Sequence, residues 1–165
     1  MNHIKANRRN QGILGEAGDL EDFLFGSSRQ SLAIVGASLR KLDGPQCFYC
    51  GQGLQEADVD HFIPFVLYPR DLAHNFVLAH PYCNRSKSDS LAAKVHLQRW
   101  LDRLMVKSSQ LGEIGMAAGV AVDGATMHRV AAWGYANAHA AQARAWVKAA
   151  NYEVVGSDYL AQLTC

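Results

Sequence analysis

Two short motifs pair metal-binding residue types, and in each the members are separated by two residues. Thiolates and imidazoles at this spacing converge on a turn, and two such pairs can complete a tetrahedral zinc site. The four residues are Cys47, Cys50, His80 and Cys83. Zinc would then supply folding free energy to a region that has little regular structure. The alternative is two unrelated sets of buried residues, but the matched spacing favours a structural zinc site.

A second candidate lies between these pairs, where Asp60 directly precedes His61. A carboxylate binds hard divalent cations, and an imidazole, which ordinarily titrates near neutral pH, can take a proton from water. Successive residues of a strand point to opposite faces, so we expect a local bend that brings both side chains to one site. Taken alone, such a dipeptide is more often an ordinary exposed surface pair.

Further polar residues surround the second metal-binding pair. Asn84 follows Cys83 directly, so its amide oxygen would be held rigidly enough to bind a cation. We expect Arg85 and Lys87 to contact phosphate groups, although a solvated helix face explains them equally well. For Asn75 we expect hydrogen bonds to loop backbone that keep the imidazole of His61 in its orientation.

Together, the segments CFYCGQGL, VDHFIP and HNFVLAHPYCNRSKSD resemble the HNH endonuclease superfamily, in its zinc-containing branch. The resemblance covers roughly residues 45–89. It implies an α+β fold, with a small zinc-stapled ββα-metal core (the HNH or His-Me finger) flanked by α-helices on both sides. Two departures stand out: His80 replaces the usual cysteine, and residues 65–70 replace a common glycine-containing loop, whose substrate contacts therefore do not transfer.

The resemblance also implies roles for single residues. His61 matches the general base, and Asn75 matches the middle asparagine of the family name. Asp60 and Asn84 match the ligands of a catalytic divalent cation such as Mg²⁺, whereas the zinc would be structural. The implied activity is hydrolysis of DNA, which we expect to be double-stranded, by a one-metal mechanism. A non-catalytic zinc-stabilised nucleic-acid-binding module and an RNA-directed nuclease remain as alternatives.

Composition sets the broad limits. A hydrophobic fraction of 49% and a charged fraction of 19% are typical of a globular protein, and the net charge of +1 means that a nucleic-acid surface must be local. No apolar run is long enough for a membrane span or a signal peptide, so we expect a cytoplasmic location. The implied division is a basic N-terminal arm and helical flank (1–44), the nuclease core (45–89) and a helical C-terminal region (90–165).

Apolar spacing and glycine positions predict the elements. We expect a short helix and a longer one within 20–42, strands at 58–62 and 75–79, and a short helix after Cys83. A further helix should be capped by Ser90 or Asp89 and run to Lys107, and another should span 125–150. Four glycines should interrupt the chain between these last two helices: Gly112, Gly115, Gly119 and Gly124.

Overall fold

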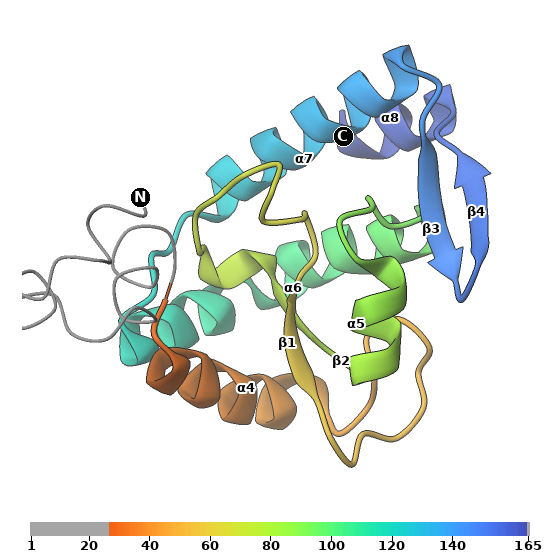
Figure 1. Ribbon diagram of the computed structural model, residues 1–165. Helices are drawn as coiled ribbons and strands as arrows, with labels where there is room; N and C mark the ends of the chain where they lie inside the picture. The colour runs from red at the N-terminus through yellow and green to blue at the C-terminus, as the bar shows by residue number, and fades with distance from the viewer. Residues whose placement is uncertain (1–26, 165) are drawn as a thin grey trace, which may run out of the picture.

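The computed structural model describes residues 27–164, which form an α+β arrangement with two small antiparallel sheets (Figure 1). In chain order the elements are α4 (Arg29–Asp43), β1 (Asp58–His61), the 3₁₀ helix η1 (Ala73–Asn75), β2 (Phe76–Ala79), α5 (Pro81–Lys87), α6 (Lys94–Ala118), α7 (Gly124–Ala140), β3 (Arg144–Lys148), β4 (Asn151–Val154) and α8 (Ser157–Leu163). Among the described residues no helix is both long and apolar enough to cross a membrane.

The β1–β2 hairpin and α5 form the centre of the molecule. The strands pair from Asp58 opposite Ala79 to His61 opposite Phe76, and every residue of β2 is buried. Helix α5 follows β2 directly and packs on both strands. The predicted ββα core is therefore confirmed, with a Cys/His cluster at its base.

Helix α4 covers one side of this hairpin. It begins after Ser28, whose hydroxyl accepts a hydrogen bond from the backbone N–H of Ser31, and it ends at Gly44, where φ is +86°. Its buried residues Val35 and Leu39 belong to the core. The longer of the two helices predicted within 20–42 is present, and it ends at Asp43. The shorter helix and basic arm expected before Gly26 lie outside the described residues.

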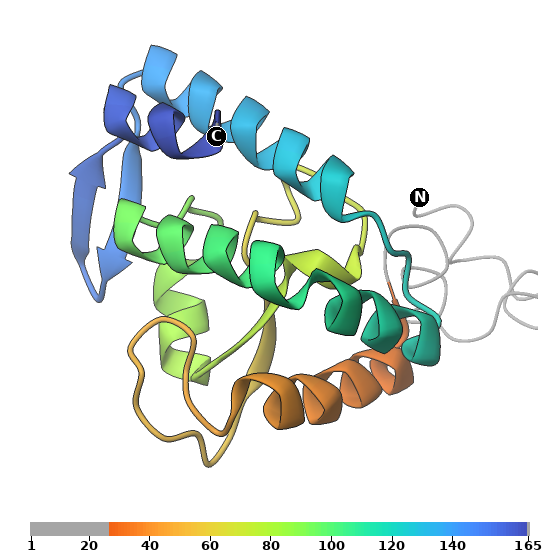
Figure 2. The same cartoon turned by 180° about the vertical axis from the view of Figure 1, so that it is seen from behind.

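Helix α6 runs across the molecule between α4 and α7 (Figure 2). It is longer than predicted, because it bends at Lys107 and continues through Gly112 and Gly115. A Cβ at Gly115 would lie 2.6 Å from Cγ2 of Val122 and 2.7 Å from Cβ of Ala73, so this glycine permits close packing and does not end the helix.

The predicted start of α6 is also wrong. The helix begins at Lys94, without a side-chain cap, because the preceding residues are extended and pair with β3. The backbone N–H of Ala93 donates to the carbonyl of Trp146, and that of Trp146 donates to the carbonyl of Leu91. These backbone bonds between distant segments replace the local cap that Ser90 or Asp89 would have supplied.

The single helix expected over 125–150 is only partly present. Helix α7 ends at Ala140, and the chain then forms the β3–β4 hairpin, with Gln142 at φ +53°. Trp146 and its β-branched neighbour Val147 have high strand propensity, and Trp146 is 1% exposed. Burial of this ring against distant segments outweighs the helical tendency of the alanine-rich stretch.

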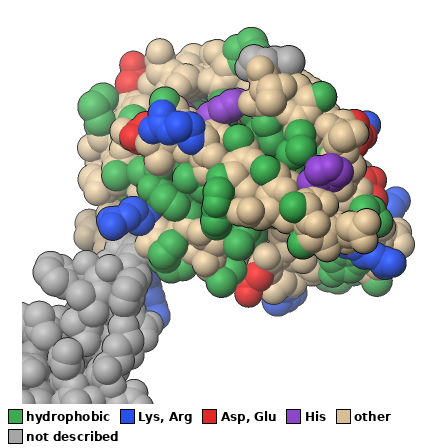
Figure 3. Space-filling model, turned by 90° about the horizontal axis from the view of Figure 1, so that it is seen from above, with side chains coloured by type: hydrophobic (Ala, Val, Ile, Leu, Met, Phe, Trp, Pro, Cys, Tyr) green, Lys and Arg blue, Asp and Glu red, His purple; other side chains and the backbone are tan. Residues whose placement is uncertain are grey.

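Two of the three tryptophans of the chain are buried. Trp100 on α6 stacks on Phe62 with ring centroids 4.7 Å apart, and Trp146 is enclosed beside α5. Trp133 differs, because its side chain on α7 is 56% exposed. Figure 3 looks onto the side that carries α7, where hydrophobic side chains gather at the surface.

Candidate metal centre and active site

The structure brings together the four predicted zinc ligands. The ligand atoms of Cys47, Cys50, His80 and Cys83 all lie within 4.8 Å of one another, and the three cysteines are free thiols. Three sulfurs and one imidazole nitrogen are donors that zinc prefers in tetrahedral structural sites. The cluster can therefore hold one structural zinc ion.

The backbone shapes both halves of this cluster. The first pair sits on a turn closed by the N–H of Gly51, which donates to the carbonyl of Cys47 at 2.9 Å, and the φ of +74° at Gly51 suits a glycine. The second pair opens α5, where His80 precedes Pro81 at the first helical position. The N–H of Phe48 donates to the carbonyl of Leu78, which joins the turn to β2.

The orientation of His80 leaves one nitrogen for a metal. Its Nε2 lies 3.0 Å from the carbonyl oxygen of Gly53, so this nitrogen is the donor, and Nδ1 lies 3.2 Å from Sγ of Cys50. The hydrogen bond to Gly53 raises the pKa of His80 above its usual value. A carbonyl that fixes the imidazole in this way is the usual partner of a zinc-bound histidine. His80 thus fits the site despite its departure from the family pattern.

The sulfurs differ in how easily they ionise. Burial opposes ionisation of Cys47, but hydrogen bonds from backbone N–H groups, including those of Cys50 and His80, outweigh it and lower its pKa to about 7. Burial raises the pKa of Cys83 to about 12, and the neighbouring thiolates add to this shift. Three thiolates held this close repel one another, so their joint ionisation calls for a bound cation.

Asp60 and His61 lie at the end of β1, but the expected bend between them is absent. The pairing of β1 with β2 continues to His61, so the two side chains point to opposite faces. Asp60 is 7% exposed and its Oδ2 accepts a hydrogen bond from the hydroxyl of Tyr49 at 2.5 Å. On the other face, Nε2 of His61 lies 2.6 Å from Oδ1 of Asp71.

Lys87 does not lie where a phosphate contact would require it. Its side chain is fully buried, and its ammonium donates to the carbonyl of His61 at 3.0 Å and lies 3.3 Å from Oδ2 of Asp60. Burial lowers the pKa of Lys87, and the nearby Asp60 opposes that shift. Because Cys83 and Lys87 are four residues apart, they share the inward face of α5, whereas Arg85 remains exposed. The expected phosphate-binding role of Lys87 therefore does not fit its position.

The two asparagines occupy different environments. Asn84 is half-buried, and its amide donates to Oδ2 of Asp58 at 3.0 Å. Asn75 is fully buried, and its side chain accepts from the N–H of Ile63 and donates to the carbonyl of the same residue. These two bonds fix the turn that follows His61, as expected of a residue that bonds loop backbone.

Three residues that the sequence analysis did not single out contact the candidate site. Asp58 shares the face of Asp60, and strand alternation could have indicated it. Tyr49 and Asp71 approach the site only through the folding of loops, which no spacing in the sequence predicts. Asp71 is held by His61 and by the backbone N–H of Ser27; burial opposes ionisation, but these hydrogen bonds leave its pKa below the usual value.

The donors on the α5 side of β1 suit an oxygen-preferring cation. Two carboxylates, Asp58 and Asp60, lie on one face of the strand, and the amide of Asn84 is hydrogen-bonded to Asp58. Carboxylate and amide oxygens are the ligands that Mg²⁺ and Ca²⁺ favour, and zinc would prefer the nearby sulfurs. The residue types are thus those of a hard divalent cation site, while the ammonium of Lys87 lies 3.3 Å from Oδ2 of Asp60.

Comparison with known proteins agrees with this geometry. Residues 47–90 match the family model described as HNH endonuclease. The match spans the Cys/His cluster, both strands of the β1–β2 hairpin and α5, and it confirms the resemblance found in the sequence. It indicates a nuclease-like function related to nucleic acid. No curated protein matches the chain, and no solved structure does.

Proposed function

We propose that the protein is a metal-dependent HNH endonuclease that hydrolyses phosphodiester bonds of double-stranded DNA by a one-metal mechanism. One observation carries the proposal: the segment that matches the HNH family folds as a ββα unit with Asp60 and His61 at the end of its first strand. Within this proposal, residues 45–89 form the nuclease core, and residues 1–44 and 90–165 are its flanks.

His61 is the general base of the proposed reaction. Its side chain is 24% exposed, so water can reach it, and Phe65 and Phe76 pack against its ring. The carboxylate of Asp71 binds Nε2–H, which leaves Nδ1 to take the proton of the attacking water. Such a carboxylate fixes both the tautomer and the orientation of the imidazole.

Asp60 and Asn84 hold the catalytic cation in this proposal, and Asn75 keeps the turn after His61 in place. A divalent cation bound there would stabilise negative charge on the scissile phosphate and on the departing 3′ oxygen. Arg85, which is exposed on α5, contacts a backbone phosphate. Lys87 serves inside the protein as the counter-ion of Asp60.

One observation favours the alternative of a non-catalytic nucleic-acid-binding module. The carboxylate of Asp60 already has an internal cationic partner, Lys87, at 3.3 Å. A protein that needs no catalytic cation would be stable with this ion pair as it stands. The two functions differ in one measurable property, because only the endonuclease cuts DNA.

Supercoiled plasmid provides the test. The purified protein should convert it to nicked or linear DNA with Mg²⁺ and should not do so with EDTA. His61→Ala should lower the rate by about 100-fold or more, the usual contribution of a positioned base. His128→Ala, which removes a half-buried histidine of α7, is the matched control and should cut normally. DNA binding without any cutting by the wild type would favour the binding module.

A further inference from the structure

Tyr49 links the Cys/His cluster directly to the candidate cation ligand. It lies between Cys47 and Cys50, so the metal-binding turn carries it, and its side chain is 4% exposed. Its hydroxyl donates to Oδ2 of Asp60 at 2.5 Å. Burial raises the pKa of Tyr49 well above its usual value, and the charge of Asp60 adds to the rise, so the hydroxyl remains a donor at any physiological pH.

The two oxygens of Asp60 are engaged unequally. Oδ2 receives both the hydroxyl of Tyr49 and the ammonium of Lys87. Within residues 27–164 no hydrogen bond or ion pair engages Oδ1. In the described part of the chain, Oδ1 is not one of the buried side-chain atoms that lack a hydrogen-bond partner, so it reaches solvent. The arrangement therefore leaves one oxygen of a largely buried carboxylate free for a further ligand.

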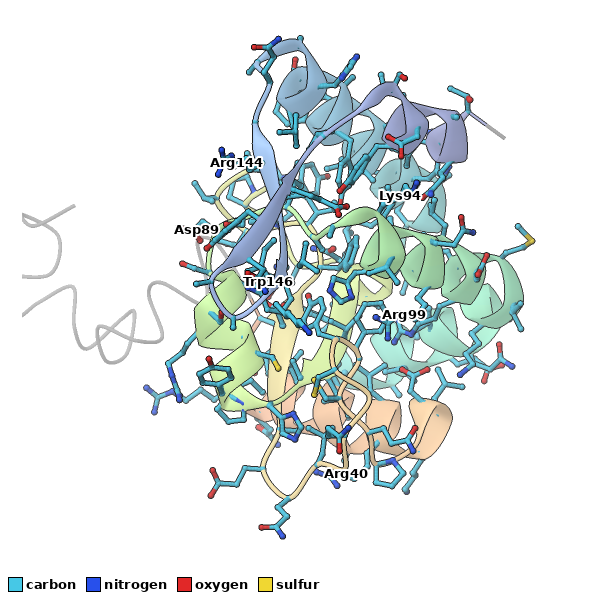
Figure 4. All side chains as sticks on the ribbon, turned by 90° about the vertical axis from the view of Figure 1, so that its right-hand side faces the viewer. Arg40, Asp89, Lys94, Arg99, Arg144 and Trp146 are labelled. Carbon is cyan, nitrogen blue, oxygen red and sulfur yellow. The ribbon has the colours of Figure 1, made fainter. Side chains whose placement is uncertain are left out.

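The position of Tyr49 is itself tightly fixed. Arg99 reaches from α6 and donates to the carbonyls of Phe48 and Tyr49, at 2.7 and 3.1 Å (Figure 4). The ring of Tyr49 makes edge contacts at 5.2 Å with the rings of His96 and Trp146. A hydroxyl on a ring confined in this way can restrict a carboxylate to one rotamer.

We propose that Tyr49 is a positioning residue that fixes Asp60 through Oδ2, so that Oδ1 alone is presented to the catalytic divalent cation. The inference rests on the proposed function for the identity of the cation ligand. It gives the Cys/His turn a second role besides stabilising the fold, because the turn sets the geometry of the cation ligand. Partners that hydrogen-bond a ligating carboxylate typically contribute a factor of about 10–100 to metal affinity or activity.

Mn²⁺ is the probe for a direct binding experiment, since free Mn²⁺ is measured by electron paramagnetic resonance without any cleavage. The comparison uses the full-length, zinc-loaded wild type with Tyr49→Phe, and Asp60→Ala defines the binding that depends on Asp60. We expect Tyr49→Phe to raise the dissociation constant of that binding by about 10-fold or more. The Mg²⁺ concentration for half-maximal cleavage should rise in parallel, while the rate at saturating Mg²⁺ changes much less.

Tyr135→Phe is the matched control. Tyr135 is also fully buried, and its hydroxyl donates to the carbonyl of Ala92 at 2.6 Å, so this variant loses a comparable hydrogen bond. It should lose a similar amount of stability while its Mn²⁺ affinity stays at the wild-type value. Both variants should retain about one zinc per chain.

The outcomes separate this inference from the proposed function. Unchanged Mn²⁺ affinity in Tyr49→Phe, or in Asp60→Ala, overturns the positioning role. Equal losses of affinity in Tyr49→Phe and Tyr135→Phe also overturn it, because they would reflect general destabilisation. A wild type that binds Mn²⁺ through Asp60 but cuts no DNA refutes the endonuclease, whereas weakened binding in Tyr49→Phe alone still supports this inference.

Discussion

Replacing Asp71 with alanine should slow DNA cleavage by about 10- to 100-fold and leave zinc binding unchanged. The side chain of Asp71 is 8% exposed, and its Oδ1 lies 2.6 Å from Nε2 of His61. A hydrogen bond to a charged group contributes about 1.5–3 kcal/mol in such surroundings. Since each 1.4 kcal/mol is a factor of ten, the loss of orientation should cost one to two powers of ten in rate.

The same substitution should lower the free energy of unfolding, and the loss should depend on pH. Asp71 also accepts the backbone N–H of Ser27, and its hydrogen bonds hold its folded pKa below the unfolded value. A carboxylate of this kind stabilises the fold at pH values above its unfolded pKa and ceases to do so as pH falls through its folded pKa. The stability difference between wild type and Asp71→Ala should therefore be full at neutral pH and shrink below about pH 4.

Asp43→Ala is the control for cleavage. Asp43 pairs with Arg103 at 2.8 Å and Lys107 at 2.9 Å, and these cations lower its pKa in spite of partial burial. Its removal should destabilise the fold without changing the rate. Asp71→Asn should be as slow as Asp71→Ala, because an amide NH₂ facing Nε2 would stabilise the wrong tautomer of His61. Plasmid cleavage by Asp71→Ala at the wild-type rate, measured at a temperature where all variants are folded, would refute the orienting role.

Four further variants have expected results. The wild type should contain about one zinc ion per chain by atomic absorption, and Cys50→Ser should contain less. Acidification should release zinc from the wild type, because protons compete with the metal for the thiolates. Folded wild-type protein that never contains zinc would contradict the site. Gly115→Ala should lower the free energy of unfolding by about 1–3 kcal/mol, because its new Cβ would overlap Val122. The thermal midpoint of unfolding should fall accordingly. Gly112→Ala, with its nearest neighbour at 3.4 Å, should be neutral or stabilising, and equal effects at the two glycines would contradict the packing argument. Arg85→Ala should weaken DNA binding alike for all sequences and reduce the salt slope by about 1, whereas an unchanged slope would exclude a phosphate contact.

The core elements could be predicted because the residues that determine them are close together in sequence. The cysteine pairs, the alternation along β1 and the helix end at Gly44 all depend on local spacing or local backbone geometry. Lys87 shows where this reasoning ends. A lysine is expected at the surface, and only the approach of β1 supplies the carboxylate that makes its burial possible.

The C-terminal region differs from the prediction for a related reason. Alanine spacing favoured one long helix, but Trp146 forms part of a strand because residues 91–93 provide backbone partners for it. Tyr49 and Asp71 were missed because their contacts depend on how two loops fold, and neither loop has a characteristic periodicity. Local patterns thus identified the ligand types, and tertiary contacts decided what surrounds them.

The contact between Tyr49 and Trp146 has a consequence for the order in which the protein assembles. All four zinc ligands have been synthesised by residue 83, yet the ring that packs on the metal-binding turn comes from β3, after α6 and α7. Contacts between residues so distant in sequence form late, because the intervening chain must be ordered first. A nascent chain should accordingly acquire zinc before the surroundings of Tyr49 are rigid, and pulse-labelling hydrogen exchange during refolding should find α5 protected before β3. Simultaneous protection of the two would show that they fold as one unit.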